Sequence, residues 1–274
     1  MAVDGVSIVI AVCNLEGFTR MCLDYIRKNT VLPYELVIVD NGSTDGTRRY
    51  IEDVRRECDV TYIRNKENLG PIIAVNQGIE RSKYGYICQM HNDVVIFEKG
   101  WLGKMTGVME KEEKVGIACL AGRQHIRRNA SCDEDTLKHN LLSIGLNPPM
   151  AEEYADVAVI DGMCFLIKKA VIKEIGALDE TYGLMHFYDM DISLASIRAG
   201  YRNVAVNVLA FHVGNGGTTR RTDFYKDLVP DDLRLYNKNS AIFKRKWRDM
   251  LPCDVRKDDV PASRSPILRW NRKR

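Results

Sequence analysis

Several apolar, β-branched runs of the chain are followed at once by side chains that can bind a metal ion or a nucleotide. The polar residues after the early runs are Asn14, Asp40, His91, Asn92 and Asp93. Carboxylate and amide oxygens are ligands that Mg²⁺ prefers, and an imidazole beside them is tolerated by Mn²⁺. A carboxylate such as that of Asp40 can accept hydrogen bonds from a base or a ribose hydroxyl, or it can cap its own turn.

A second set of reactive side chains lies in the later half of the chain. Asp161 and Gly162 precede an apolar run, and Asp189 and Asp191 stand two residues apart at the start of an expected helix. Carboxylates at such a place take part in chemistry or stabilise the first helical turn. His212 follows another apolar run, and a neutral imidazole is a good metal ligand at neutral pH. The glycines after it allow backbone N–H groups to approach a phosphate.

The elements that must position these residues alternate between strand and helix. The apolar runs predict strands at residues 7–12, 35–39, 60–63, 84–90, 115–120, 157–160, 163–167 and 204–210. Helical spacing predicts helices at 15–27, 47–58, 71–81, 101–111, 168–175, 191–200 and 233–250. This alternation favours an α/β fold with a mainly parallel sheet, in which ligands bind outside the carboxyl ends of the strands. Residues 121–156 interrupt the pattern and predict a long loop region with a short helix at 133–143.

Composition and charge exclude several classes of protein. The chain has 274 residues, of which 45% are hydrophobic and 28% charged, which is ordinary globular composition. The sequence has no run long enough to span a bilayer and no signal-peptide pattern, so we expect a cytoplasmic protein. A net charge of +3 is too small to indicate nucleic-acid binding. The eight cysteines form no Cys-x-x-Cys pair, which argues against a zinc site.

The motifs at these turns, taken in order, resemble those of the family 2 glycosyltransferases with a GT-A fold, particularly the rhamnosyltransferase-like group. The segments that carry the resemblance are SIVIAVCN at 7–14, ELVIVDNGSTDGT at 35–47, NLGPIIAVNQG at 68–78, HNDV at 91–94, DGMCFLI at 161–167, GALDE at 176–180, YDMD at 188–191 and FH at 211–212. The match extends from about residue 7 to residue 247. It implies a Rossmann-like sheet flanked by helices and the transfer of a sugar from a nucleotide diphosphate, usually with inversion and a divalent metal.

The resemblance also implies roles for individual residues. The residues expected to contact the donor nucleotide are Ala11, Asn14, Asp40, Asn68, Gly70 and Asn92. Asp93 and His212 match metal positions for Mn²⁺ or Mg²⁺, and Asp189 matches the base that deprotonates the acceptor hydroxyl. Acceptor or donor-sugar contacts are implied for Asp161, Gly162 and Asp191. Two residues depart from the family pattern, because His91 and Tyr188 stand where the motifs usually carry acids.

The expected domains are a catalytic domain at 1–232, with a nucleotide-binding half at 1–120 and an acceptor-binding half at 121–232, and a C-terminal helix with a basic tail at 233–274. Residues 242–274 contain eleven Lys and Arg against four Asp, with aromatic residues among them. This pattern predicts peripheral contact with the inner face of the cell membrane, or else a helix packed on the catalytic domain followed by a soluble tail.

The implied partners are a nucleotide-sugar donor and a glycan or lipid-linked glycan acceptor, as in the biosynthesis of cell-surface polysaccharide. Two alternatives stay open. A nucleotidyltransferase also holds a metal-bound nucleotide on an α/β sheet, although its early Gly-rich loop followed by Arg and Lys is absent after Val12. A catalytically silent relative that only binds a sugar or a partner would explain the departures at His91 and Tyr188.

Overall fold

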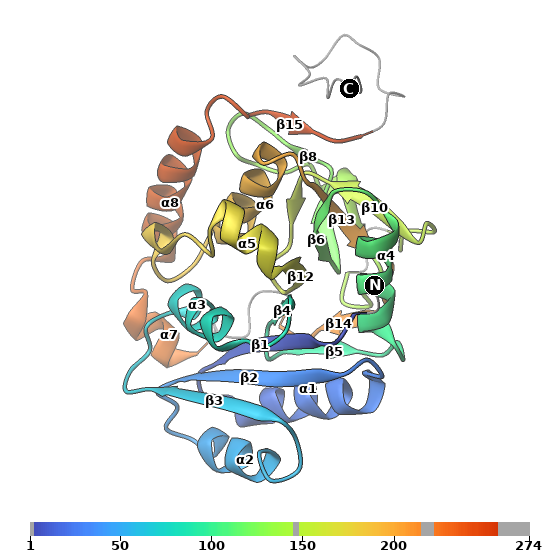
Figure 1. The fold of residues 1–274 in the computed structure, drawn as a ribbon. Coiled ribbons are helices and arrows are strands. Elements are labelled where there is room, and N and C mark those ends of the chain that lie inside the picture. The colour runs from blue at the N-terminus through green and yellow to red at the C-terminus, as the bar shows by residue number, and fades with distance from the viewer. Residues whose placement is uncertain (1–2, 145–147, 215–221, 257–274) are drawn as a thin grey trace.

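The computed structural model describes residues 3–144, 148–214 and 222–256, and its centre is a mixed sheet with helices on both faces (Figure 1). In spatial order the sheet contains β10 (Tyr154–Val157), β13 (Arg202–Val206), β6 (Val115–Cys119), β12 (Cys164–Lys168), β4 (Tyr86–Met90), β1 (Val6–Val12), β2 (Tyr34–Asn41) and β3 (Val60–Asn65). The pairs β4–β1, β1–β2, β2–β3 and β13–β6 are parallel, whereas β12 and β10 are antiparallel to their neighbours. The expectation of an α/β fold with a mainly parallel sheet is therefore confirmed.

Short strands complete the half of the molecule after residue 90. A three-stranded sheet contains β11 (Val159–Ile160), β7 (Ala121–Arg123) and β9 (Leu137–His139). Two antiparallel pairs join β14 (Ala210–His212) to β5 (Val94–Ile96), and β15 (Cys253–Asp254) to β8 (His125–Ile126). The pair β14–β5 matters most for function, because it brings the end of β14 next to the residues that follow β4.

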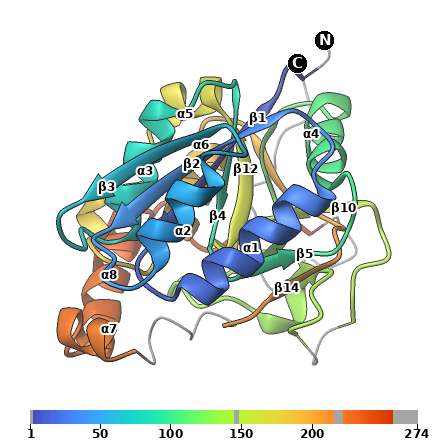
Figure 2. The same cartoon turned by 90° about the horizontal axis from the view of Figure 1, so that it is seen from below.

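Helices cover the two faces of the sheet in two layers, as Figures 1 and 2 show from two directions. One face packs against α1 (Glu16–Asn29), α2 (Thr47–Val54) and α4 (Trp101–Lys111), and the other against α3 (Pro71–Arg81), α5 (Lys169–Ile175), α6 (Tyr188–Arg198) and α8 (Asp232–Lys246). The remaining helical segments are α7 (Asp223–Leu228) and the short turns η1 (Glu134–Thr136) and η2 (Glu180–Tyr182).

The central strands are mostly apolar because consecutive side chains enter two different cores. In β1, Ile8 and Ile10 belong to the core on the α1 side, whereas Val9 belongs to the core on the α3 side. All three side chains are fully buried. A strand covered on both faces cannot alternate with polar residues, which is why its sequence reads as a continuous hydrophobic run.

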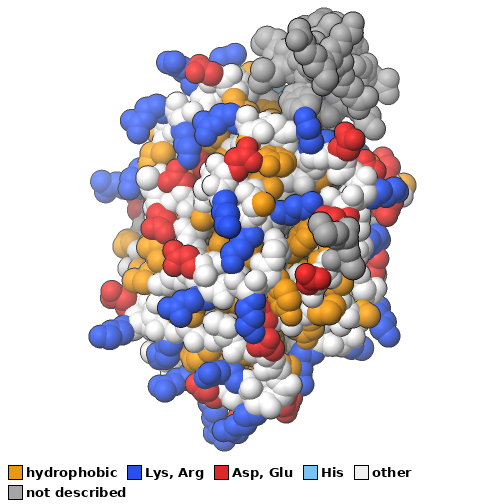
Figure 3. All heavy atoms as spheres, in the orientation of Figure 1, with side chains coloured by type: hydrophobic (Ala, Val, Ile, Leu, Met, Phe, Trp, Pro, Cys, Tyr) orange, Lys and Arg blue, Asp and Glu red, His pale blue; other side chains and the backbone are white. Residues whose placement is uncertain are grey.

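The outer surface carries charges of both signs. On the face shown in Figure 3, Lys and Arg side chains are interspersed with those of Asp and Glu, and hydrophobic side chains lie among them. The chain as a whole has 40 basic and 37 acidic residues, and on this face the two kinds are mixed. This face therefore lacks the broad basic patch that a nucleic-acid-binding surface needs.

Three expectations about the fold are wrong. The region 121–156, expected to be a long loop, contains β7, β8, β9 and most of β10. The helix expected at 133–143 is only the single turn η1, because the chain then forms β9, where Leu137 pairs with Arg123 of β7. The helix expected at 191–200 begins earlier, at Tyr188. Its start follows His186 and Phe187, which both have left-handed backbone conformations with φ of 69° and 68°. Asp189 and Asp191 consequently both lie in the first turn of α6.

The C-terminal helix is part of the main fold rather than an appendage. Phe243 and Trp247 are 0% and 1% exposed and belong to the core on the α3 side. After α8, Cys253 of β15 pairs with Ile126 of β8. The two aromatic side chains that suggested membrane contact, Phe243 and Trp247, are therefore buried inside the protein and cannot enter a bilayer. The basic tail beyond Arg256 lies outside the described residues.

Candidate active site

A pocket opens at the carboxyl ends of β1 and β4, where the topology predicts a ligand site. Its polar lining residues are Asn41, Asn68, Gln89, His91, Asn92, Asp93, Tyr188, His212 and Tyr225. Ala11 and Cys13 line it from the end of β1, and Leu184, Met185 and Leu228 line it from the later half of the chain. The pocket thus combines a few convergent polar groups with apolar walls, which is the usual character of a small-molecule site.

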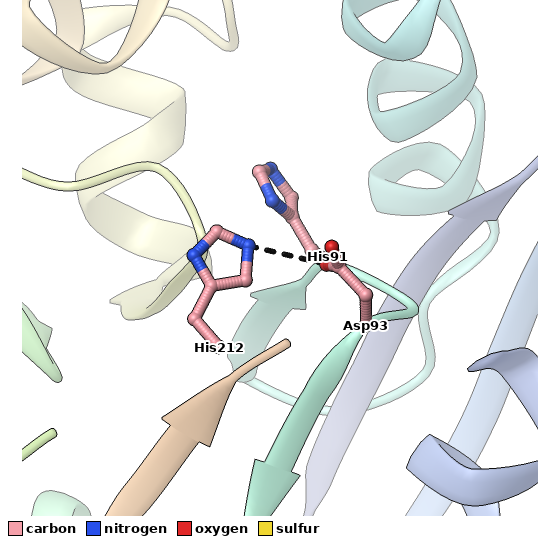
Figure 4. Close-up of side chains that lie close together, drawn as sticks. All are labelled: His91, Asp93 and His212. Carbon is pink, nitrogen blue, oxygen red and sulfur yellow. Dashed lines mark ion pairs between the residues drawn. The ribbon is translucent and has the colours of Figure 1, made fainter. Parts of the chain in front are cut away.

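His91, Asp93 and His212 meet at this pocket (Figure 4). Each offers a possible ligand atom, and these atoms all lie within 4.8 Å of one another. Nε2 of His212 lies 3.2 Å from Oδ1 of Asp93, and the two imidazole rings have centroids 5.6 Å apart. The sequence predicted the meeting of Asp93 and His212 but left open whether His91 joins them.

Two short strands bring these residues together from distant parts of the chain. Asp93 directly precedes β5, and His212 ends β14, in register with Val94. The backbone N–H of Val213 donates to the carbonyl of Asp93 at 3.0 Å, which ties the two strand ends. The antiparallel pairing of β14 with β5 is therefore the feature that places an imidazole beside the carboxylate.

In this cluster His91 favours the neutral form that binds a cation, whereas the Asp93 carboxylate favours a proton on His212 that a bound cation would displace. Burial, together with the nearby charge of His212, lowers the pKa of His91, so its ring is neutral and carries a free lone pair. Burial lowers the pKa of His212, but the pairing with Asp93 outweighs it and raises the pKa overall. Nε2 of His212 is buried and faces the Asp93 carboxylate at 3.2 Å, in a geometry that falls short of a regular hydrogen bond. A buried ring nitrogen left in this way, beside a carboxylate and a neutral imidazole, fits a metal site.

Asp189 lies beside the pocket, next to Tyr188 in the first turn of α6. Its Oδ2 accepts a hydrogen bond from the backbone N–H of Gly162 at 3.1 Å, and its Oδ1 accepts one from Met190 at 2.9 Å. Burial and the negative charge of Asp161 raise the pKa of Asp189 to about 6. A carboxylate with a pKa near neutrality, oriented by backbone bonds, is well suited to accept a proton.

Asp161 and Gly162 lie in the turn between β11 and β12, next to Asp189. Oδ1 of Asp161 accepts a hydrogen bond from the backbone N–H of Met163 at 3.1 Å. A Cβ atom at Gly162 would come within 2.5 Å of the hydroxyl of Tyr188, so only glycine allows this ring to pack here. Neither Asp161 nor Gly162 lines the pocket, and their contact with a sugar stays a prediction.

Three of the expected nucleotide contacts line the pocket, and three do not. Ala11, Asn68 and Asn92 are among the lining residues. Gly70 has a φ of +87° and leaves room for Leu184, whose Cδ2 would lie 2.9 Å from a Cβ at this position. Gly70 therefore affects the pocket indirectly, because the absence of a side chain leaves room for Leu184, which lines the pocket.

Asn14 and Asp40 hold the turn after β2 rather than lining the pocket. Asp40 is 0% exposed; its Oδ1 accepts a hydrogen bond from the backbone N–H of Ser43 at 2.8 Å, and its Oδ2 accepts one from the hydroxyl of Tyr62 at 2.7 Å. Oδ1 of Asn14 accepts a hydrogen bond from the backbone N–H of Thr44 at 2.8 Å. Both side chains thus support the turn, and the direct donor contacts expected of them stay predictions.

Asp191 does not reach the pocket either, and the expected acceptor contact is corrected. Its side chain is 4% exposed and points to α8, where Oδ1 accepts hydrogen bonds from Trp247 Nε1 at 2.7 Å and from the Tyr182 hydroxyl at 2.8 Å. Oδ2 accepts a bond from Lys246 at 2.9 Å. The two carboxylates of the YDMD motif therefore diverge, with Asp189 at the site and Asp191 joining α6 to the C-terminal helix.

We expect replacement of Trp247 by phenylalanine to lower the free energy of unfolding by about 1–3 kcal/mol, because the buried carboxylate of Asp191 loses a donor. It should also reduce enzymatic turnover, since Asp191 anchors the helix that carries Asp189. Urea unfolding and assays of both proteins test this. Trp101→Phe is a matched control, because Trp101 is fully buried and donates to Thr30 Oγ1 at 2.9 Å away from α6. Equal turnover in the two variants would contradict the anchoring role.

Some lining residues were missed by sequence reasoning. Asn41 lies inside the segment ELVIVDNGSTDGT at 35–47, where the sequence predicted a nucleotide contact for its neighbour Asp40 but not for Asn41 itself. Tyr188 was noted only as a departure from the family pattern. Tyr225, in α7, lines the pocket and donates to Asp232 Oδ1 at 2.8 Å, and no spacing in the sequence marked it.

A sequence profile described as "Glycosyl transferase family 2" matches residues 7–176, which is more than half of the chain. The chain belongs to this family. A curated family relative is the poly-beta-1,6-N-acetyl-D-glucosamine synthase of Staphylococcus epidermidis, 25% identical over 179 residues. That match covers 65% of this chain but 42% of the relative, so the chain spans less than half of that relative's length.

Solved structures with a similar fold support the GT-A architecture of this family 2 member. A mannosyltransferase from Pyrobaculum calidifontis, in complex with GDP-Man and Mn²⁺, matches with a TM-score of 0.58 and 16% identity over 78% of this chain and 59% of that one. GalNAc-T7, with UDP, GalNAc and Mn²⁺, matches with a TM-score of 0.63 and 14% identity over 90% of this chain and 54% of that one. Within the described residues, none of the helices combines the length and apolar character needed to cross a bilayer.

Proposed function

We propose that the protein transfers a sugar from a nucleotide-diphosphate donor to a hydroxyl group of a glycan or lipid-linked glycan, with inversion at the anomeric carbon. The observation that carries this proposal is the meeting of His91, Asp93 and His212 at a pocket on the carboxyl edge of the sheet. The reaction also requires a general base, and Asp189 beside that pocket is a carboxylate with a raised pKa. Membership of glycosyl transferase family 2 supports the same reaction class.

The donor would occupy the pocket with its diphosphate toward the cluster of His91, Asp93 and His212. These three residues would hold Mn²⁺ or Mg²⁺, which when bound neutralises the charge that develops on the leaving nucleotide diphosphate. The amide side chains of Asn41, Asn68 and Asn92 line the same pocket and can hydrogen-bond to the nucleotide. Because the apolar residues of the later half form the opposite wall, the reacting sugar would be shielded from water.

Asp189 would act as the general base. It accepts the proton of the acceptor hydroxyl while that oxygen attacks the anomeric carbon, and the nucleotide diphosphate leaves with the electrons of the broken bond. A single displacement of this kind inverts the anomeric configuration. The two backbone hydrogen bonds to Asp189 fix its orientation, and burial together with the charge of Asp161 keeps its pKa high enough for efficient proton transfer.

The proposed compartment is the cytoplasm. All eight cysteines are free, and Cys88 and Cys164 have sulfur atoms 3.9 Å apart without a bond between them. Unpaired thiols at this separation are characteristic of a reducing environment. The S. epidermidis relative is named for a polysaccharide of N-acetylglucosamine, which supports cell-surface polysaccharide as the product class.

The proposed function is tested by thermal-shift screening with UDP-, GDP- and dTDP-sugars in the presence of Mn²⁺, followed by an assay of donor hydrolysis. We expect one nucleotide base to stabilise the protein by ligand linkage and the same donor to be hydrolysed slowly. Binding without hydrolysis or transfer would indicate a silent relative. Formation of pyrophosphate from a sugar phosphate and a nucleoside triphosphate would indicate a nucleotidyltransferase.

We propose that any membrane contact resides in the tail beyond Arg256, because Phe243 and Trp247 of the preceding segment are buried. The full-length protein should sediment with anionic vesicles at low salt, whereas a protein ending at Arg256, which retains β15, should not. Each cation near the surface contributes only about 1 kcal/mol, so the binding should weaken as salt increases. Neutral phosphatidylcholine vesicles are the control. Equal sedimentation of the two proteins would remove the tail from membrane binding.

A further inference from the structure

The two residues at which this chain departs from the acidic motifs of its family are in direct contact. Nε2 of His91, which follows β4, lies 3.3 Å from the hydroxyl oxygen of Tyr188, the first residue of α6. Both side chains line the pocket, and they come from motifs that are far apart in the sequence. The two departures therefore form one structural unit.

The position of Tyr188 is fixed from three sides. Its backbone follows two residues with left-handed conformations, which sets the direction in which α6 begins. The hydroxyl group packs over Gly162, where a Cβ atom would lie only 2.5 Å from the oxygen. The next residue, Asp189, is bonded to the backbone N–H of Gly162 at 3.1 Å. Because the ring has little freedom to move, its hydroxyl is a fixed partner for the imidazole.

This contact determines which nitrogen of His91 faces the cluster. A neutral imidazole has one N–H donor and one acceptor nitrogen, and a hydrogen bond at one nitrogen selects the tautomer. In Figure 4 one ring nitrogen of His91 faces His212 and Asp93, and the other points away from them. If Nε2–H donates to the Tyr188 oxygen, Nδ1 keeps its lone pair for a cation. The backbone of His91 is held as well, since its N–H donates to the carbonyl of Met163 at 2.8 Å.

We propose that Tyr188 is a positioning residue that holds His91 as a third metal ligand, and that the resulting two-imidazole, one-carboxylate site selects divalent transition metals over Mg²⁺. The inference rests on the metal dependence contained in the proposed function and deepens it by naming the class of metal. Mg²⁺ strongly prefers oxygen ligands, whereas imidazole suits transition metals. A carboxylate in place of His91 would supply oxygen and reduce this selectivity.

The test measures metal binding without any donor or acceptor. Titration calorimetry with Co²⁺, Mn²⁺ and Mg²⁺ is carried out on the wild-type protein and on Tyr188→Phe, Gly162→Ala and His91→Asp. The visible absorption of bound Co²⁺ gives a second readout that depends on the ligand set rather than on activity. Gly162→Ala displaces the Tyr188 hydroxyl without removing it. It therefore provides a second test in case the phenylalanine ring of Tyr188→Phe packs differently from the tyrosine ring. Tyr182→Phe is the matched control, because it loses a buried hydroxyl that bonds to Asp191 instead.

We expect the wild-type protein to bind Co²⁺ and Mn²⁺ more tightly than Mg²⁺ by at least tenfold. Loss of a partner of a ligating histidine typically weakens metal binding 10–100-fold, and we expect this loss for Tyr188→Phe and Gly162→Ala but not for Tyr182→Phe. His91→Asp should change the Co²⁺ absorption and reduce the difference between the affinities for Mn²⁺ and Mg²⁺, because His212 is then the one imidazole left in the cluster. Thermal unfolding of each variant checks that it is folded.

The inference is overturned if Tyr188→Phe and Gly162→Ala bind Co²⁺ as the wild type does, or if His91→Asp leaves the metal preference unchanged. Failure of the proposed function looks different. In that case the wild-type protein neither transfers nor hydrolyses a nucleotide sugar with any metal, whatever its affinities for the metals alone. A wild-type protein that transfers sugar equally well with Mg²⁺ and Mn²⁺ and shows no affinity difference would reject the selectivity and retain the transferase.

Discussion

Replacing Asp189 by asparagine should lower sugar transfer by ~10²–10⁴-fold, the usual contribution of a positioned general base. The carboxamide has the shape of the carboxylate and can still accept the hydrogen bond from Gly162, but it cannot take up the acceptor proton. Asp189 does not line the pocket, so donor binding should be unchanged. The measurements are kcat for transfer and the affinity for the nucleotide sugar, determined in the same buffer.

The same substitution should stabilise the fold at neutral pH. The pKa of Asp189 is about 6 in the folded protein against an ordinary value of 3.8, because burial and the charge of Asp161 disfavour the ionised form. A raised pKa means that the ionised carboxylate costs stability, and that this cost appears as the pH rises from 3.8 through about 6. The asparagine side chain of the variant carries no such charge. We therefore expect a higher unfolding temperature for Asp189→Asn at about pH 7.5 and no difference near pH 4.

The pH dependence of transfer provides the control for this assignment. In the wild-type protein the acidic limb of kcat/KM should fall near pH 6, since a protonated Asp189 cannot act as a base. Asp161→Asn removes a neighbouring negative charge and should move that limb to lower pH, whereas a purely structural role of Asp189 predicts no such movement. Near-normal transfer by Asp189→Asn, or a product with retained configuration, would exclude the proposed mechanism.

The parts of the fold that the sequence predicted are those in which local pattern and tertiary environment agree. The helices at 71–81 and 101–111 were predicted at their observed ends, and the buried runs of β1 and β2 were recognised because both faces of these strands are covered. A continuous run of β-branched residues is typical of a strand that is buried on both faces. The parallel pairing of β1 with β2 and β4, and of β2 with β3, then followed from the alternation of elements, whereas the antiparallel pairing of β12 and β10 did not.

Other parts could not be predicted because their structure depends on distant partners. The segment at 133–143 has enough helical character to suggest a helix, but its pairing with β7 converts part of it to a strand. The basic, aromatic sequence of the C-terminal helix was compatible with a membrane surface or with packing on the catalytic domain, and the bond of Trp247 to the distant Asp191 decides for packing. Tertiary contacts rather than local propensity decided the outcome in both cases.

The candidate site shows the same division between local and distant information. The resemblance to the family's metal positions predicted that Asp93 and His212 would meet, and they do. The expected reason, strands of the same sheet, is wrong, because His212 ends β14, which pairs with β5 in a separate two-stranded sheet. The resemblance did not predict that His91 and Tyr188 would be in contact, since a pairing between two single residues has no local signal. The family motif assigned the base to Asp189, but it did not show that Asp191 turns away toward Trp247, because that depends on where α6 begins.

The second large effect is expected at Asp93. This residue is 9% exposed and groups with two imidazole rings, so its carboxylate is the only anionic member of the described cluster. Asp93→Asn preserves the size of the side chain and removes the negative charge that favours a cation. Because metal assistance is worth several kcal/mol of transition-state stabilisation, transfer should fall by roughly 10²–10³-fold. Titration of the variant with Mn²⁺ should show correspondingly weak binding.

The Asp93 and Asp189 variants should fail in different ways, and this difference is the sharpest check on the two roles. Excess Mn²⁺ should restore part of the transfer by Asp93→Asn, because the two histidines still offer ligands, but it should not rescue Asp189→Asn. EDTA should abolish transfer by the wild-type protein and leave its fold intact, since the core does not depend on the cluster. Full activity of the wild-type protein in EDTA would show that Asp93 and His212 hold no metal needed for the reaction, and the loss in Asp93→Asn would then need another cause.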